Sequence, residues 1–296
     1  MNTTLHDNFV RAILADKEIA IDYFRSCLPQ NIAARLDLSA LTQLPDTYLS
    51  KGLRKTISDI VYSCRLKEDS REVKITLLLE HKSRPDKSTP VQLLGYIASA
   101  HRKQLTEDKK LSPIIPVLLY HGRERWLYRT LGALMAGLDS ELMPFVPDYE
   151  YVYHDLGEIP DKQIQLLENK FLQASFLALK YSQLKVDLVR WIPTILSLAA
   201  DVEKNLQRVL IVYTFGISDL KEEQIIRLID EVPANIKSTV MSTKDVLVEM
   251  GRKEKTEKTV RNMIHEGLPT ELICKVLEVD PYYVSDIRQK IEGEVS

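Results

Sequence analysis

Cysteine is scarce in this sequence, and the few cysteines are not spaced as in a disulfide framework or a zinc site. There are three in 296 residues, Cys27, Cys64 and Cys274, and no two of them form a CxxC pair. An odd number and wide spacing support neither a disulfide framework nor a zinc site. A reducing compartment suits such a chain, and we therefore expect a cytoplasmic protein.

The sequence also lacks a long apolar run and a large net charge. No stretch approaches the roughly 18 apolar residues of a membrane helix, and residues 1–11 are polar, unlike the apolar core of a signal peptide. Forty Lys and Arg nearly balance 42 Asp and Glu, which gives a formal net charge of −2. We therefore expect no membrane partner, and any attraction to nucleic acid must come from local basic patches.

The composition that is present is typical of a globular protein with a large core. Hydrophobic residues make up 45% of the chain and charged residues 28%. Apolar spacing and turn residues predict an order of elements in the first half: a helix at 5–28, a short helix at 32–38, strands at 41–50, 59–66 and 73–81, a helix at 90–104 and a strand at 114–120. A strand meander followed by a helical crossover predicts a mixed sheet covered by helices, an α/β fold.

The remaining segments are less regular or helical. Residues 121–161 show no clear period, and we expect irregular structure there. The sequence predicts a helical annex at 162–245, then a charged helix and a small tail at 246–296 with breaks at Gly267 and Pro281. With the core at 1–161, three parts are predicted.

Three charged residues stand at the ends of two predicted strands. Asp59 opens one strand, and Glu80 and Lys82 close the next, two residues apart and therefore on one face. The ordinary interpretation is a strand cap and an exposed ion pair, because acid-x-Lys triplets are common. The position of Glu80 directly after three leucines argues against it, since an unpaired carboxylate in a buried strand is costly.

These residues suit a site for a hard metal ion. Mg²⁺ commonly takes one or two carboxylates from a protein, which Asp59 and Glu80 would supply, and the backbone carbonyl of His81 would add a third oxygen. A metal so held polarises a phosphoryl group and lowers the pKa of a bound water. Lys82 reaches the same face and would stabilise the developing charge. The pattern therefore predicts metal-assisted hydrolysis of a phosphodiester.

The residues around these positions resemble one known family. The similar segments are His6-Asp7-Asn8-Phe9, Leu53-Arg54, Ser58-Asp59, Leu78-Leu79-Glu80-His81-Lys82-Ser83, Pro85-Asp86 and Pro116-Val117-Leu118-Leu119-Tyr120-His121-Gly122. Together with the αβββαβ order, they resemble the Rpn/YhgA-like recombination-promoting nucleases, a transposase-like family of the PD-(D/E)xK nuclease superfamily. The resemblance implies a PD-(D/E)xK core, metal ligation by Asp59 and Glu80, and a catalytic Lys82, where many family members carry Gln.

Two further features follow from the resemblance. Gln92 and Tyr96 lie four residues apart on one helical face, and some superfamily members use Gln-x-x-x-Tyr here to steady the active site. The resemblance thus implies a site role for Gln92, whereas packing in the core explains Tyr96 equally well. Relatives are often acidic before Leu53, but this chain has Ser50-Lys51-Gly52. An acid that assists the metal from that place would be missing.

Weaker signals concern nucleic acid and the tail. Lys51, Arg54, Lys55, Arg84 and Lys87 flank the predicted site and could contact a DNA backbone, although charged loops are usually only solvated. His121 is better explained as a turn histidine that satisfies backbone groups. Residues 266–284 resemble a short helix-turn-helix of the recombinase type, but only Arg288 and Lys290 would make its last helix basic. An interaction module that forms a homo-oligomer is at least as good an explanation.

The sequence as a whole predicts a Mg²⁺-dependent DNA endonuclease linked to recombination or mobile DNA. The rival hypothesis is a catalytically decayed nuclease fold that acts as a DNA-binding or assembly protein. A nuclease acting on RNA is a third alternative that these residues leave open.

Overall fold

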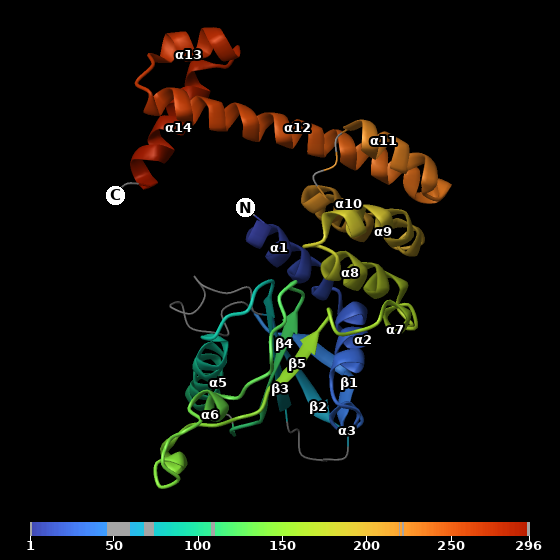
Figure 1. Ribbon diagram of the computed structural model, residues 1–296, viewed down its shortest axis with the longest axis vertical. Helices are drawn as coiled ribbons and strands as arrows, with labels where there is room; N and C mark the ends of the chain where they lie inside the picture. Colours follow the sequence, from blue (N-terminus) through green and yellow to red (C-terminus); the bar gives the residue numbers. More distant parts are fainter. Residues whose placement is uncertain are drawn as a thin grey trace. The chain divides into compact units, whose positions relative to one another are not determined.

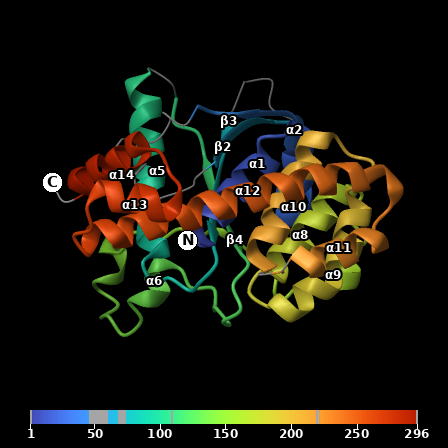
Figure 2. The same cartoon turned by 90° about the horizontal axis from the view of Figure 1, so that it is seen from above.

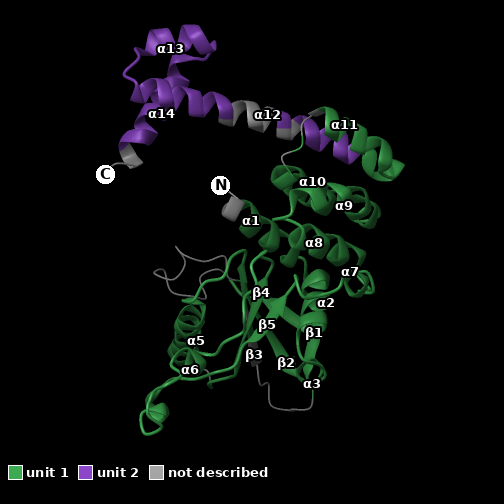
Figure 3. Ribbon diagram, in the orientation of Figure 1, with its two compact units in different colours: residues 1–237 green, residues 238–296 purple. Residues whose placement is uncertain are grey.

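The computed structural model describes residues 2–45, 60–67, 74–107, 110–218, 220 and 222–294 (Figure 1). The chain divides into two compact units, Met1–Lys237 and Ser238–Ser296 (Figure 3). The division expected at residues 161 and 245 stays a prediction. No helix in the described ranges combines the length and the apolar character needed to cross a membrane.

The first unit is built on a mixed sheet whose spatial order follows the chain. The described residues form five strands, β1 (Leu36–Gln43), β2 (Ile60–Leu66), β3 (Lys74–Lys82), β4 (Ile114–Tyr120) and β5 (Val152–Asp155). The first three pair antiparallel, and β3, β4 and β5 pair parallel. The connection from β3 to β4 runs through helix α5 (Thr89–Thr106), as a parallel pair requires a crossover. The predicted α/β class is confirmed.

Helices cover both faces of this sheet (Figures 1 and 2). On one face, Val61 and Leu118 pack in a cluster with Leu93 and Tyr96 of α5. On the other face lie helices α2 (Lys17–Cys27) and α8 (Lys170–Lys180), whose Phe24 and Phe176 contact Tyr62 of β2 and His154 of β5. Because neighbours along a strand point to opposite faces, Val61 and Tyr62 define the two sides.

The first predicted helix is in fact two helices, so that prediction was wrong. Helix α1 (Asn2–Leu14) ends before Ala15, and α2 begins at Lys17. The carboxylate of Asp16 accepts hydrogen bonds from the backbone N–H groups of Glu18 and Ile19. Such an N-cap satisfies the free donors of a new helix and favours the break.

Two other local predictions were wrong. A helix was expected at 32–38, but α3 (Gln30–Ala33) is one short turn and β1 already begins at Leu36. Irregular structure was expected at 121–161, yet β5 lies there, parallel to β4. Four residues are too few to show a period, and only pairing with β4 identifies this strand.

The rest of the first unit is largely helical. It contains α6 (Leu131–Leu134), the 3₁₀ turn η2 (Met143–Phe145), α7 (Asp161–Ile164), α9 (Lys185–Leu198), α10 (Lys204–Ser218) and α11 (Glu222–Glu231). Helix α10 packs on α1, where Phe9 stacks on Tyr213 with ring centroids 3.9 Å apart. This contact packs the helical part of the first unit, through α10, against the first helix of the chain.

The second unit has a small apolar core of its own. It contains most of α12 (Ala234–His265) together with α13 (Thr270–Leu277) and α14 (Pro281–Glu294). Val260, Ile273, Val284 and Ile287 are buried against one another. Both predicted breaks are confirmed, since Gly267 lies between α12 and α13 with φ of +74° and Pro281 starts α14. The predicted homo-oligomer stays a prediction.

Candidate active site

Glu80 and Lys82 lie at the end of β3 and face helix α5. Glu80 pairs in register with Leu118, and cross-strand partners share a face of the sheet. Leu118 packs against α5, so Glu80 and Lys82 point to that side. Glu80 is 3% exposed, and its Oε1 lies 3.1 Å from Nζ of Lys82. The predicted common face is confirmed. Glu80 is buried and Lys82 is partly buried, so the pair is not an exposed one.

A polar network around Lys82 joins the strand to the first turns of α5. Its Nζ lies 3.2 Å from Oδ2 of Asp86 and donates to Oε1 of Gln92 at 3.0 Å. Gln92 Nε2 donates in turn to Oγ of Ser88 at 3.0 Å, and Ser88 Oγ donates to Oδ1 of Asp86 at 2.6 Å. The structure therefore brings Gln92 to Lys82. Asp86 was missed as a site residue, although an acid four residues after Lys82 in a short loop was a readable signal.

Tyr96 takes the structural role that was its alternative interpretation. Its ring is fully buried in the cluster of Val61, Leu93 and Leu118. Gln92, one helical turn earlier, contacts Lys82 directly.

The electrostatics of the network keep Lys82 charged. Burial alone would lower the pKa of Lys82, but the charge of Glu80 and hydrogen bonds to Glu80 and Asp86 outweigh it, so the pKa lies above its ordinary value. Burial would raise the pKa of Asp86, but hydrogen bonds from Ser88 and Lys82 lower it. Lys82 is therefore a cation at neutral pH, suited to stabilise negative charge rather than to accept a proton.

One carboxylate oxygen in the site has no hydrogen bond. Oε2 of Glu80 is buried, and no donor reaches it within the part of the chain that the structure describes. A buried carboxylate oxygen without a partner is costly, and a bound cation would satisfy it. The carboxylate of Glu80 therefore fits a hard metal ion, which prefers oxygen ligands.

The other predicted ligand cannot be placed. Asp59 lies outside the described residues, as do Lys51, Arg54 and Lys55, while Arg84 and Lys87 are exposed. Among the residues that are described, no three His, Cys, Asp or Glu side chains gather around a common point suited to a metal. Asp59 directly precedes Ile60, which pairs with Leu79, the residue directly before Glu80.

The opposite face of the same sheet end carries histidines. His81 Nε2 lies 3.0 Å from Oδ1 of Asp7 on α1, so its side chain points away from Glu80. The ring of His121 stacks 6.0 Å from that of His81 and lies 4.9 Å from that of His6. His6 Nδ1 is 2.8 Å from the Tyr213 hydroxyl of α10. The His-Asp motif near the start of the chain thus packs α1 and α10 against the end of the sheet.

Two of these histidines are neutral at pH 7. Burial, followed by the nearby His81, lowers the pKa of His6 to about 4. Burial and the same neighbour lower the pKa of His121 well below its ordinary value. The backbone N–H of His121 donates to the carbonyl of Lys82 at 3.0 Å, which agrees with the expected structural role.

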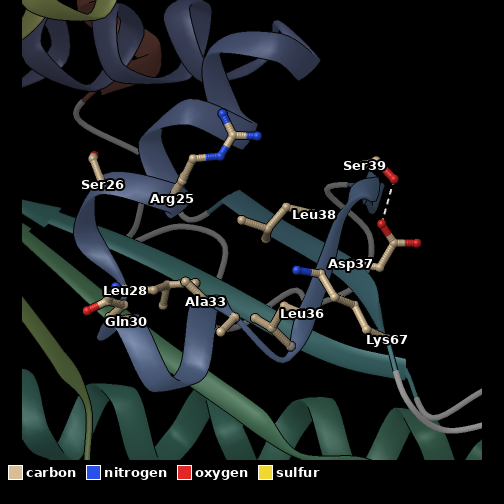
Figure 4. Close-up of a pocket in the computed structure, with 11 residues that line it drawn as sticks. Arg25, Ser26, Leu28, Gln30, Ala33, Leu36, Asp37, Leu38, Ser39 and Lys67 are labelled. Atoms are coloured by element: carbon tan, nitrogen blue, oxygen red, sulfur yellow. Dashed lines mark hydrogen bonds between the residues drawn. The ribbon is translucent and has the colours of Figure 1, made fainter. Parts of the chain in front are cut away.

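A cavity of the first unit lies away from the Glu80–Lys82 network. A cavity of about 670 Å³ opens between α2, α3 and β1, with Arg25, Asp37 and Lys67 in its wall (Figure 4). Asp37 is engaged by Oγ of Ser39 at 2.5 Å. None of the residues that line this cavity belongs to the Glu80–Lys82 network, and we do not assign it to the site.

The fold and the network define an α/β protein in which a buried glutamate pairs with a partly buried lysine beside the crossover helix. Residues 4–210 match the family described as "Putative transposase, YhgA-like". The chain belongs to that family, which confirms the resemblance seen in the sequence.

Several curated relatives from Escherichia coli are similar to this chain. Recombination-promoting nuclease RpnC of strain K12 is 28% identical over 122 residues, which cover 41% of this chain and 40% of the relative. Recombination-promoting nuclease RpnA of the same strain is 26% identical over 164 residues, covering 55% and 56%. The inactive recombination-promoting nuclease-like protein RpnE is 24% identical over 160 residues, covering 54% and 53%. The chain thus spans about half the length of these relatives. No solved structure matches it.

Proposed function

We propose that this protein is a Mg²⁺-dependent DNA endonuclease with a PD-(D/E)xK-type core, acting in recombination or on mobile DNA. The observation that carries the proposal is the buried pair of Glu80 and Lys82, whose free carboxylate oxygen has no partner among the described residues. The names of the relatives RpnC and RpnA, both recombination-promoting nucleases, support the same reaction class.

Each residue has a stated role in this proposal. Asp59, Glu80 and the backbone carbonyl of His81 would hold the divalent cation, because all three supply the oxygen atoms that Mg²⁺ prefers. When bound, the cation supplies Lewis-acid activation of the phosphodiester and of the attacking water. Lys82 keeps its positive charge and stabilises the negative charge that develops on phosphorus.

Asp86 and Gln92 are positioning residues in the same proposal. They contact Nζ of Lys82 at 3.2 and 3.0 Å. A lysine side chain has four rotatable bonds, and three fixed acceptors reduce the orientations that its ammonium group can take. The reaction would therefore begin with the cation of Lys82 already in place, which is the condition for effective electrostatic stabilisation.

The proposal is tested by plasmid cleavage with purified protein, with and without Mg²⁺. We expect nicked or linear plasmid only with the metal, and a loss of at least a hundredfold in Asp59→Ala, Glu80→Gln and Lys82→Met. A matched control is Lys180→Met, which removes another partly buried ion pair of the first unit, 2.8 Å from Asp161. Cleavage that persists in all three site variants would refute the assignment of the site.

The alternative function has support of its own. One matched relative, RpnE, is named an inactive nuclease-like protein, and this chain has Ser50-Lys51-Gly52 where relatives are often acidic. A wild-type protein that retains plasmid in a gel-shift assay but never cuts it, with Mg²⁺ or Mn²⁺, would favour the DNA-binding or assembly function. Cleavage of an RNA strand but not of plasmid would assign the same site to RNA.

A further inference from the structure

A second cavity, of about 360 Å³, shares a wall with the Glu80–Lys82 network. Asp86, which contacts Lys82, lines it together with the neighbouring Pro85 and Lys87. Its volume is at the small end of the range of about 300 to 1,000 Å³ that is typical of small-ligand sites. A group bound there would lie directly beside the candidate active site.

The far wall of this cavity is aromatic and apolar. Trp126 is half-buried, and its indole packs edge-on against Tyr120 and Tyr153, with ring centroids 5.1 and 5.9 Å away. Leu127 and Leu134 extend the wall and are 55% and 38% exposed. The cavity therefore offers a flat ring and apolar edges to a planar ligand.

Hydrogen bonds hold the backbone of this wall in place. The Tyr153 hydroxyl donates to the carbonyl of Trp126 at 2.8 Å, and the Tyr151 hydroxyl donates to the carbonyl of Arg129 at 3.0 Å. Both tyrosines lie on or next to β5, so the segment around Trp126 is anchored to the sheet. The wall is preformed, which lowers the entropic cost of binding a ligand.

The charge at the mouth of the cavity is positive. Lys87, Arg125 and Arg129 are exposed lining residues, and within the described ranges none of them forms an ion pair with a carboxylate. The lining acid Asp86 is already engaged by Lys82 and Ser88. An anionic ligand therefore meets three cations that form no ion pair with the described residues.

We propose that this cavity binds one unstacked nucleotide of a single DNA strand, with its base against Trp126 and its phosphates at Arg125 and Arg129. A planar base with flanking phosphates matches both the aromatic wall and the basic mouth, as in other sites for single-stranded nucleic acid. The proposal rests on the proposed function, because the strand would continue from this cavity to the candidate active site past Asp86.

Trp126 itself provides a direct readout of binding. The chain has two tryptophans, so the variant Trp191→Phe leaves Trp126 as the single tryptophan, whose emission is excited selectively at wavelengths that tyrosine does not absorb. The probe is a fluorescein-labelled 12-nucleotide oligo-dT in EDTA for anisotropy, and the unlabelled strand for fluorescence quenching. We expect the strand to quench Trp126 as the base stacks on it.

Charge removal tests the mouth of the cavity and leaves the side chains of its aromatic wall unchanged. Arg125→Ala combined with Arg129→Ala should weaken binding of the oligo-dT about tenfold and reduce the slope of log K against log salt by about 1.4, since each lost phosphate contact removes about 0.7. The control is Arg208→Ala, an exposed arginine of α10 that lines neither cavity, and it should leave both quantities unchanged.

The outcomes separate this inference from the proposed function. If plasmid is cut but oligo-dT neither quenches Trp126 nor loses affinity in the double variant, the cavity assignment is wrong and the nuclease stands. If quenching and the charge effect occur but plasmid is never cut, the cavity assignment stands and the nuclease function fails. Absence of any oligo-dT binding would overturn the cavity assignment as well.

Discussion

Removing Lys82 should destabilise the protein strongly, whereas removing the whole Glu80–Lys82 pair should not. Glu80 is 3% exposed and Lys82 neutralises it at 3.1 Å. In Lys82→Met the carboxylate would remain buried without its cation, and breaking a buried pair in this way costs about 3 to 5 kcal/mol. In Glu80→Met combined with Lys82→Met no buried charge remains, and similar replacements are often neutral or stabilising.

The pH dependence of this penalty can be worked out. A glutamate with an ordinary pKa of about 4.3 can be protonated at pH 7 for about 3.7 kcal/mol, and at pH 5 for about 1 kcal/mol. Protonation removes the buried negative charge, so its free-energy cost is an upper limit on the destabilisation at each pH. We therefore expect Lys82→Met to lose between about 3 and 4 kcal/mol at pH 7 but only about 1 kcal/mol at pH 5, relative to the wild type.

Urea unfolding at the two pH values provides the measurement, followed by tryptophan fluorescence because Trp126 and Trp191 both lie in the first unit. The matched control is Lys103→Met. Its ion pair with Glu107 is longer, at 3.9 Å, and more exposed, so it should cost less than about 1 kcal/mol at either pH.

Two results would contradict this reasoning. A loss in Lys82→Met that is below about 1 kcal/mol at pH 7, or that does not shrink at pH 5, would mean that Glu80 does not carry a buried charge. A double variant as unstable as the sum of the single variants would mean that the two side chains are not energetically coupled.

Two further predictions concern His154 and Asp16. Burial lowers the pKa of His154 to about 4. Below about pH 6.5 the unfolded state therefore takes up a proton that the folded state does not. The free energy of unfolding should fall by about 3 kcal/mol between pH 6.5 and pH 4 as a result. In urea unfolding, His154→Leu should remove this part of the pH dependence. If the free energy of unfolding of the variant fell between pH 6.5 and pH 4 as much as that of the wild type, the assignment to His154 would be wrong. Asp16→Ala should cost about 1 kcal/mol by removing the cap of α2, whereas Asp16→Asn should cost much less; equal thermal midpoints for the two variants would refute the cap.

Elements with strong periodic or apolar patterns were predictable from the sequence. The strand at 114–120 coincides with β4, and the helix at 90–104 lies within α5. Their signals are local, because an apolar run flanked by turn residues or a helical period needs no partner to be seen. The class of the fold followed from the order of these elements.

Elements defined by partners were not predictable in the same way. Strand β5 has four residues, and its pairing with β4 alone makes it a strand. The break between α1 and α2 depends on one capping side chain within a continuous apolar period. In both cases a tertiary or capping contact outweighs the local pattern.

The sequence by itself determined the common face of Glu80 and Lys82, because alternation along a strand is a property of the backbone. It also determined that His81 faces the other way. Only the tertiary structure decided that Asp86 and Gln92 converge on Lys82, that Glu80 keeps an oxygen without a donor among the described residues, and that a basic, tryptophan-lined cavity adjoins them. These features join a strand, a loop, a helix and a segment some 40 residues further along the chain, and no local pattern encodes distances between elements that folding alone brings together.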